Sequence, residues 1–203
     1  MVKKNISNSV KLIKYYKFIN YNLIYNNKAI NRYKKDNFEI SVNKADNLER
    51  LKKSIMNIKN CSLKNSATKM VFSDGNPKSK IMLIGEAPGA NEDQEGLPFV
   101  GRAGILLDKM LASINLNRKN VYVSNIINYR PPENRRPTDE EMNRYLPFVK
   151  KHIEIISPKI LILLGSTAMN ALIDNDVVIS KVRGQWIEKE FGQCKTSVIV
   201  TFH

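Results

Sequence analysis

A loop rich in glycine and proline is the segment of this sequence whose residue types best suit a ligand site. In GEAPGANEDQEGLPFVGRAG (85–104), the glycines and prolines permit tight backbone turns around a flat ligand or a phosphate. The same loop carries the carboxylates of Glu86 and Glu92, which suit hydrogen bonding or proton transfer. Its glycine spacing fits neither a GxxxxGKS/T phosphate loop nor a GxGxxG dinucleotide turn. The pattern therefore indicates a site of another kind.

Other polar residues fall at the ends of short apolar runs that are typical of buried strands. These runs are KIMLIG (80–85), NVYVSNII (120–127), PKILILLG (158–165) and TSVIVTF (196–202). The glycine-rich loop follows the first run, Asn125 lies near the end of the second, Ser166 follows the third and His203 follows the fourth. Because open parallel sheets bind ligands beyond the carboxyl ends of their strands, these positions predict one shared site.

The segments between and before these runs show the apolar spacing of helices. We expect helices over about 46–64, 105–114, 138–156 and 167–173. Thr138 followed by Glu141 is a capping-box signature for the start of the third helix. This alternation predicts an α/β fold, a three-layer αβα sandwich around a mostly parallel, four-stranded central sheet.

The length and the charge of the chain set its organisation and its class of partner. The 203 residues suit one α/β domain, which we place at 46–203, after a basic Lys- and Asn-rich extension at 1–45. That extension is a DNA-contacting arm, an organelle-targeting segment or a weakly ordered tail. The net charge of +14 suits a polyanion such as nucleic acid, and it equally fits a biased coding composition.

The sequence contains no pattern typical of a membrane-spanning helix, a disulfide scaffold or a zinc site. No apolar run reaches the length of about 18 residues that a membrane-spanning helix requires, so we expect a soluble protein with no membrane partner. Cys61 and Cys194 share no spacing typical of a zinc site or a disulfide scaffold. A reducing, cytoplasmic setting and a monomer are the expectations.

Three motifs together resemble one known family. GEAPG (85–89), Glu92-Asp93, GxPFVG (96–101) and AGxxL (103–107) resemble the pocket motif of the iron-sulfur (family 4) uracil-DNA glycosylases. Asn125 with the RPP run (130–132) resembles the family's second motif, and His203 resembles the His of its HP motif. The resemblance runs from about Cys61 to the end. It implies the uracil-DNA glycosylase fold and an enzyme of base excision repair that hydrolyses the N-glycosidic bond of deoxyuridine in DNA.

The resemblance also assigns roles to the residues that contact the base. Phe99 would stack on the uracil ring, and the Asn125 amide would pair with uracil N3–H and O4. His203 would donate a hydrogen bond to uracil O2, where negative charge builds as the base leaves. Taken alone, Phe99 also fits a core position, Asn125 a turn and His203 a plain terminal residue.

The glycine-rich loop would supply the remaining catalytic groups. Backbone amides of the segment Gly85, Glu86, Ala87, Pro88 and Gly89 would stabilise the leaving base. Ala87 stands where other glycosylase classes place an Asp, so either Glu86 or Glu92 would orient or activate the attacking water. The sequence leaves the choice open, and each carboxylate also fits a solvated loop charge.

Basic side chains near these motifs suit contacts with the phosphates of uracil-containing DNA. The candidates are Arg102, Lys109, Arg130, Arg135 and Arg136. A solvated basic face is the alternative for any one of them.

The chain departs from the family at its cluster ligands. The family carries a 4Fe-4S cluster on four cysteines, whereas here only Cys61 matches and the other positions hold Ile58, Tyr129 and Tyr145. We therefore expect no cluster and no other cofactor or metal, and we expect packing by the two tyrosines to replace it.

The second departure concerns the His motif. The family continues past its His with Pro, a DNA-probing loop and a last helix, whereas this sequence ends at His203, so we expect a C-terminally incomplete domain. A catalytically impaired, DNA-binding remnant is therefore the alternative to an active glycosylase. A nucleotide-binding α/β enzyme of another kind would require a phosphate motif that the sequence lacks.

Overall fold

A computed structural model of the chain describes residues 44–173 and 178–203. The predicted extension at 1–45 therefore lies outside the described residues, apart from the two residues that begin helix α2 (Lys44–Met56). Its boundary with the domain stays a prediction.

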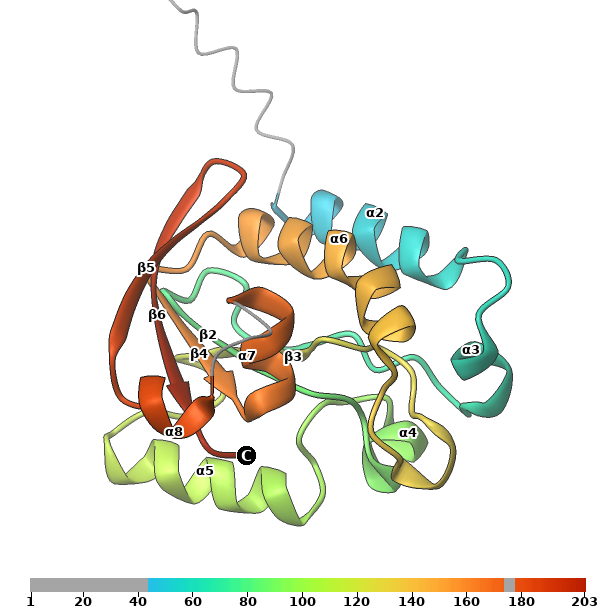
Figure 1. Cartoon of the computed structure of the whole chain (residues 1–203), viewed down its shortest axis with the longest axis horizontal. Coiled ribbons are helices and arrows are strands. Elements are labelled where there is room, and N and C mark those ends of the chain that lie inside the picture. Colours follow the sequence, from blue (N-terminus) through green and yellow to red (C-terminus); the bar gives the residue numbers. More distant parts are fainter. Residues whose placement is uncertain (1–43, 174–177) are drawn as a thin grey trace, which may run out of the picture. The chain divides into compact units, whose positions relative to one another are not determined.

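A mixed sheet of six strands forms the centre of the described chain (Figure 1). The strands are β1 (Asp74–Gly75), β2 (Ile81–Gly85), β3 (Tyr122–Asn125), β4 (Ile160–Leu164), β5 (Trp186–Phe191) and β6 (Cys194–Thr201). They lie in the order β1-β3-β2-β4-β6-β5. The four inner strands β3, β2, β4 and β6 are parallel, and β1 and β5 pair antiparallel at the two edges. The predicted α/β class and mostly parallel sheet are confirmed.

The four inner strands are the four apolar runs of the sequence, whereas the two edge strands were not predicted. Strand β2 is almost wholly buried, as expected for a strand covered on both faces. Strand β5 instead alternates exposed and half-buried residues up to its buried last residue, Phe191, and carries Glu188, Lys189 and Glu190. Charged residues of this kind protect sheet edges, but they hide the strand from a search for apolar runs.

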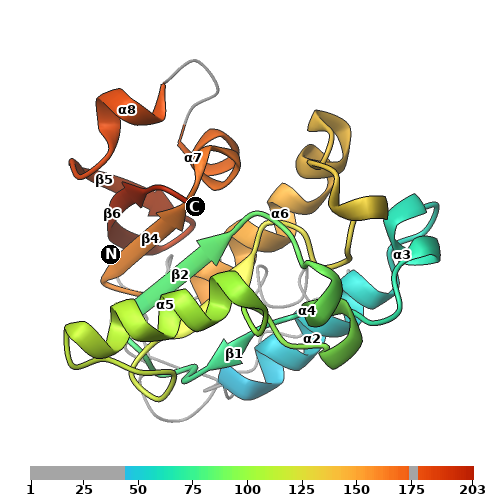
Figure 2. The same ribbon diagram turned by 90° about the horizontal axis from the view of Figure 1, so that it is seen from below.

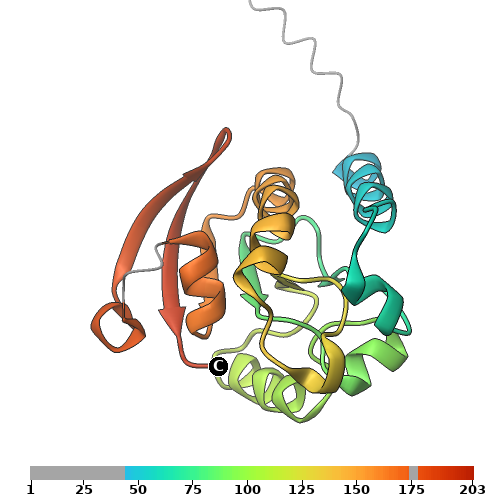
Figure 3. The ribbon, with the colours of Figure 1, turned by 45° about the vertical axis from the view of Figure 1, so that its right-hand side comes forward.

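Helices lie on both sides of the sheet. Helix α5 (Arg102–Ser113) covers one side, while α6 (Asp139–Ile156) and α2 lie on the other, as Figures 1 and 2 show. Helix α7 (Ser166–Leu172) packs against both α6 and β4 (Figure 3). The shorter segments are α3 (Ser62–Ser66), α4 (Ala90–Glu95), a 3-10 turn (Pro132–Asn134) and α8 (Ile179–Val182). None of the helices in the described ranges is long and apolar enough to cross a membrane.

Helix boundaries follow local capping chemistry. The capping box at α6 is confirmed, because the Thr138 hydroxyl accepts from Glu141 N and the Glu141 carboxylate accepts from Thr138 N.

The prediction of a single helix over 46–64 is wrong. Helix α2 ends at Met56, and Asn60 adopts a left-handed backbone with φ of 53° before the short helix α3 begins. Asn tolerates that conformation, so the chain turns there although the apolar spacing continues.

His152 sits in the core between α6 and β3. It is 3% exposed, its ring stacks on Phe72, and its Nε2 lies 2.9 Å from the Tyr122 hydroxyl. The Tyr122 hydroxyl in turn donates to Ser73 Oγ. Burial lowers the pKa of His152 to about 3, because the charged imidazolium is poorly solvated there. This histidine is therefore a neutral structural residue.

The burial of His152 predicts that the free energy of unfolding falls at acid pH, and that His152→Phe removes this part of the pH dependence. In the unfolded chain the imidazole titrates near its ordinary pKa of about 6.5, while the folded state resists protonation, so the wild type loses stability as the pH falls from about 6.5 towards 3. The loss approaches about 1.4 kcal/mol per pH unit. Urea unfolding at neutral pH and near pH 4.5 should show wild type losing on the order of 2 kcal/mol more than His152→Phe. Equal losses in the two proteins would contradict the assignment.

Candidate active site

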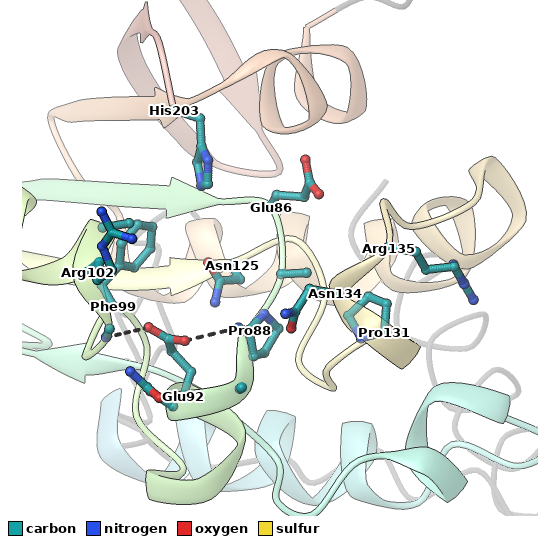
Figure 4. A pocket seen from close by; sticks show the side chains of 16 residues that line it. Glu86, Pro88, Glu92, Phe99, Arg102, Asn125, Pro131, Asn134, Arg135 and His203 are labelled. Atoms are coloured by element: carbon teal, nitrogen blue, oxygen red, sulfur yellow. Dashed lines mark hydrogen bonds between the residues drawn. The ribbon is translucent and has the colours of Figure 1, made fainter.

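A cavity of about 370 Å³ opens beyond the carboxyl ends of β2 and β3 (Figure 4). Its lining brings together most of the residues that the sequence singled out: Glu86, Ala87, Pro88, Gly89, Glu92, Phe99, Arg102, Asn125, Arg135 and His203. Gly85, Arg130 and Arg136 are not among the lining residues. The lining also includes Pro131 and Asn134, which the sequence had not proposed as contacts. The loops after three parallel strands thus meet at one place, as the fold requires.

Phe99 lies against β2 in a conformation that only close packing allows. Its φ is 56°, a left-handed value that is unfavourable for a residue with a bulky side chain, and it is 8% exposed. A Cβ at Gly85 would lie 2.4 Å from the end of the Phe99 ring, and a Cβ at Gly104 would lie 1.7 Å from the Phe99 carbonyl oxygen. Two glycines of the motif are therefore required so that this ring and its backbone can fit.

Arg118 holds the Phe99 turn from the other side. Its guanidinium donates to Phe99 O at 2.7 Å and to Pro98 O at 3.2 Å. It is also paired with Asp108 at 2.6 Å and Asp74 at 3.3 Å. No sequence pattern predicts this role, because Arg118 lies in a loop 19 residues beyond Phe99 and belongs to no motif.

Asn125 ends β3 at the floor of the cavity, directly opposite Gly85 in the pairing of β2 and β3. It is 3% exposed, and its side-chain carbonyl oxygen has no hydrogen-bond partner among the described residues. A buried polar atom without a partner is costly, so a ligand that donates a hydrogen bond here would satisfy it. Asn125 thus belongs to a strand and not to a turn, and its carbonyl oxygen is open to a donor.

The two candidate carboxylates differ in what they contact. Glu92 accepts hydrogen bonds from the backbone N–H groups of Gly89 at 3.1 Å, Val100 at 3.0 Å and Gly101 at 2.8 Å. Both of its oxygens are therefore used to join the two ends of the loop, as the dashed lines in Figure 4 show. Its neighbour Asp93 is buried and accepts from Thr68 N and Lys69 N, so it is not a solvated loop charge either.

Glu86 faces a side chain instead of backbone amides. One of its carboxylate oxygens accepts a hydrogen bond from the Thr167 hydroxyl of α7. In Figure 4 its carboxylate turns away from Asn125, while the imidazole of His203 points into the cavity from the side of β6. Glu86 and His203 thus lie on the same side of the cavity.

The candidate DNA-contacting arginines have different surroundings. Arg102 is exposed and lines the cavity, whereas Arg136 is exposed and is not among the lining residues. Arg130 donates to Asn134 Oδ1 at 2.7 Å. Arg135 lines the cavity but pairs with both oxygens of Glu141, and this hydrogen bonding lowers the pKa of the Glu141 carboxyl below its ordinary value. Arg102 and Arg136 are therefore the more available cations.

The four positions that correspond to cluster ligands all belong to, or pack against, the larger hydrophobic core. Cys61, Tyr129 and Tyr145 are buried in the same apolar cluster, with Ile58 packed against it. Cys61 Sγ lies 3.3 Å from the Tyr145 hydroxyl. Burial, and next the neighbouring Cys61, raise the pKa of both tyrosines above the ordinary value, so the hydroxyls are neutral and poor metal ligands. A 4Fe-4S cluster ordinarily needs four thiolates, and this donor set does not fit one.

Comparison with known proteins gives a consistent result. A model of the Uracil DNA glycosylase superfamily matches residues 72–203. The chain is 39% identical over 163 residues to the type-4 uracil-DNA glycosylase of Sulfurisphaera tokodaii, covering 78% of this chain and 74% of that protein. It is 38% identical over 162 residues to the type-4 enzyme of Archaeoglobus fulgidus, covering 78% and 81%. It is 42% identical over 144 residues to that of Thermotoga maritima, covering 70% and 73%.

The hydrogen bonds of Glu92 predict that its carboxylate is structural. Glu92→Gln replaces one acceptor oxygen with an NH₂ group that would face a backbone N–H, so we expect the free energy of unfolding to fall by about 1–3 kcal/mol. Denaturant titration measures this loss, and limited proteolysis should show faster cleavage within 85–104. Glu95→Gln, on the exposed side of the same short helix α4, is the matched control. A Glu92→Gln protein as stable as the control would be evidence against the clamp.

Proposed function

The chain belongs to the uracil-DNA glycosylase superfamily, and we propose that the cavity beyond β2 and β3 is where it holds a uracil flipped out of DNA. The function is that of a uracil-DNA glycosylase, a hydrolase of DNA base excision repair. The observation that carries the assignment of the cavity is the buried amide of Asn125, whose carbonyl oxygen finds no hydrogen-bond partner within the described part of the chain and lies beside the ring of Phe99.

Recognition of uracil follows from the chemistry of these two side chains. The Asn125 carbonyl oxygen would accept from uracil N3–H, and the NH₂ group would donate to O4. Cytosine presents an acceptor at N3 and an amino group at C4, so it would leave both partners mismatched. Phe99 would stack on the base, and its fixed left-handed backbone keeps the ring in place before the base arrives.

Departure of the base requires stabilisation of a uracil anion. As the bond between C1′ and N1 breaks, its electron pair passes to the base, and negative charge builds at O2. His203 is proposed to donate a hydrogen bond to O2 from its place at the rim. The N–H groups of Glu86 and Ala87 are further candidate donors, since that of Gly89 is used by Glu92.

Glu86 is the proposed partner of the attacking water. The water oxygen bonds to C1′ as the bond to N1 breaks, and Glu86 accepts a proton from the water. That proton returns through solvent to the uracil anion, so that the products are an abasic site and uracil. The hydrogen bonds of the two carboxylates support the choice of Glu86 over Glu92. Both carboxylate oxygens of Glu92 already accept hydrogen bonds from backbone N–H groups, three in all. Arg102 and Arg136 would contact phosphates and fix the register of the DNA.

We also propose that the protein works without an iron-sulfur cluster. The Cys61 thiol and the hydroxyl of Tyr145 contact each other where the type of cluster implied by the resemblance would need thiolates. The cytoplasmic location and the monomeric state remain predictions from the sequence.

The glycosylase assignment predicts release of uracil from deoxyuridine-containing oligonucleotides, both single- and double-stranded. Asn125→Ala should lower the rate by about 100-fold, since two hydrogen bonds to the base are lost and about 1.4 kcal/mol corresponds to tenfold. Asn143→Ala, exposed on α6, is the matched control and should retain the wild-type rate.

The alternative of a catalytically impaired, DNA-binding remnant makes a different prediction for the same assay. It requires that wild type release no more uracil than Asn125→Ala while still retarding uracil-containing DNA in a gel. That outcome would contradict an active enzyme.

The cluster-free proposal has its own test in the purified protein. Iron and acid-labile sulfide should be far below one cluster per chain, and a chelator should leave the melting temperature unchanged. Tyr145→Phe should lower the free energy of unfolding by about 1 kcal/mol through loss of the contact with Cys61. A stoichiometric content of iron and sulfide would overturn the proposal.

A further inference from the structure

The turn between β4 and α7 contacts two residues of the proposed catalytic machinery. Gly165 has a φ of 94°, its N–H donates to Thr201 O at 2.9 Å, and a Cβ at this position would lie 2.9 Å from His203 Cβ. Two residues later, Thr167 contacts Glu86. One short segment, distant in sequence from the glycine-rich loop, thus lies against both Glu86 and His203.

Thr167 makes this contact from within the protein. It is 1% exposed and is not among the residues that line the cavity. Its Oγ1 donates to Glu86 Oε2 at 2.5 Å, within the range of hydroxyl-to-carboxylate hydrogen bonds. Thr167 therefore reaches the site only through Glu86.

We propose that Thr167 is a positioning residue that fixes the Glu86 carboxylate for its attacking water. This inference rests on the proposed role of Glu86. A glutamate side chain at the rim of an open cavity has several accessible rotamers, and an ordered carboxylate has lost that freedom before the substrate binds. The hydrogen bond from Thr167 engages one oxygen and leaves the other to accept from water. Gly165, two residues before Thr167, contacts Thr201 and His203. These contacts hold the start of α7 in place and thereby fix the position of the Thr167 hydroxyl.

The fold supplies a matched control for the loss of this hydroxyl. Thr196 on β6 is also 1% exposed, and its Oγ1 has no hydrogen-bond partner among the described residues. Thr→Val is nearly isosteric, so Thr167→Val and Thr196→Val each remove one buried hydroxyl without leaving a cavity. Only the first of these hydroxyls contacts Glu86.

The test is the steady-state rate of uracil release from a deoxyuridine oligonucleotide. We expect Thr167→Val to lower kcat by about 10- to 100-fold, the scale of effect of a misplaced catalytic group, with KM within about twofold of wild type. Thr167→Ser, which retains the hydroxyl, should restore most of kcat, and Thr196→Val should match the wild type. In a Glu86→Gln background, adding Thr167→Val should cause no further loss, because the two residues act through one carboxylate.

Each contrary result has a distinct meaning. A Thr167→Val protein with wild-type kcat, beside an impaired Glu86→Gln protein, would overturn the inference and leave the proposed function intact. Equal impairment in Thr167→Ser and Thr167→Val would also overturn it, since packing rather than the hydroxyl would then be responsible. A Glu86→Gln protein as active as wild type would overturn both the role of Glu86 and the role of Thr167. Melting temperatures of the four single variants and of the double variant separate these effects on the rate from loss of folding.

Discussion

The left-handed backbone of Phe99 is the constraint on which the rest of the site depends. This conformation costs a bulky residue such as Phe on the order of 1–2 kcal/mol, so surrounding contacts must maintain it. Gly85 and Gly104 provide the space, Arg118 holds the Phe99 carbonyl oxygen, and Glu92 joins Val100 to Gly89. With the turn held in this way, the aromatic ring lies beside Asn125 before any ligand binds. The arrangement of Phe99 and Asn125 is therefore preorganised, because the loop is already ordered before a ligand binds.

Charged side chains serve as backbone clamps throughout this loop. Glu92, Asp93 and Arg118 each accept from or donate to at least two main-chain groups. Hydrogen bonds to ionised groups are stronger than those between neutral groups, which suits a segment with little regular secondary structure. The consequence is that most carboxylates near the cavity are already engaged. Glu86 differs from them because it accepts from a side-chain hydroxyl rather than from main-chain amides, and this difference is why we propose it, and not Glu92, as the partner of the attacking water.

The sequence predicted those features that short-range patterns determine. The inner strands follow from apolar runs, the start of α6 follows from its capping box, and the motif residues meet because the carboxyl ends of parallel strands share one edge. The distinction between Glu86 and Glu92 could not be predicted, because it depends on which N–H groups lie nearby after folding. The roles of Arg118 and Thr167 could not be predicted for the same reason, because their hydrogen-bond partners lie 19 and 81 residues away in the sequence. Arg135 is a simple basic residue in the sequence, but the fold pairs it with the capping glutamate of α6.

The positions that correspond to cluster ligands are linked by packing and hydrogen bonds in the described chain. Arg144 of α6 donates to the Asn60 carbonyl oxygen at 2.7 Å, and the adjacent Tyr145 contacts Cys61, so α6 holds the turn between α2 and α3 at two points. Tyr129 packs into the same apolar cluster directly before the segment that carries Pro131 and Asn134 to the cavity. A cluster would join these segments through one group whose loss breaks every link at once. In the described residues the same segments are linked by aromatic packing and separate hydrogen bonds, so under the cluster-free proposal the rim of the cavity would depend on the core as a whole.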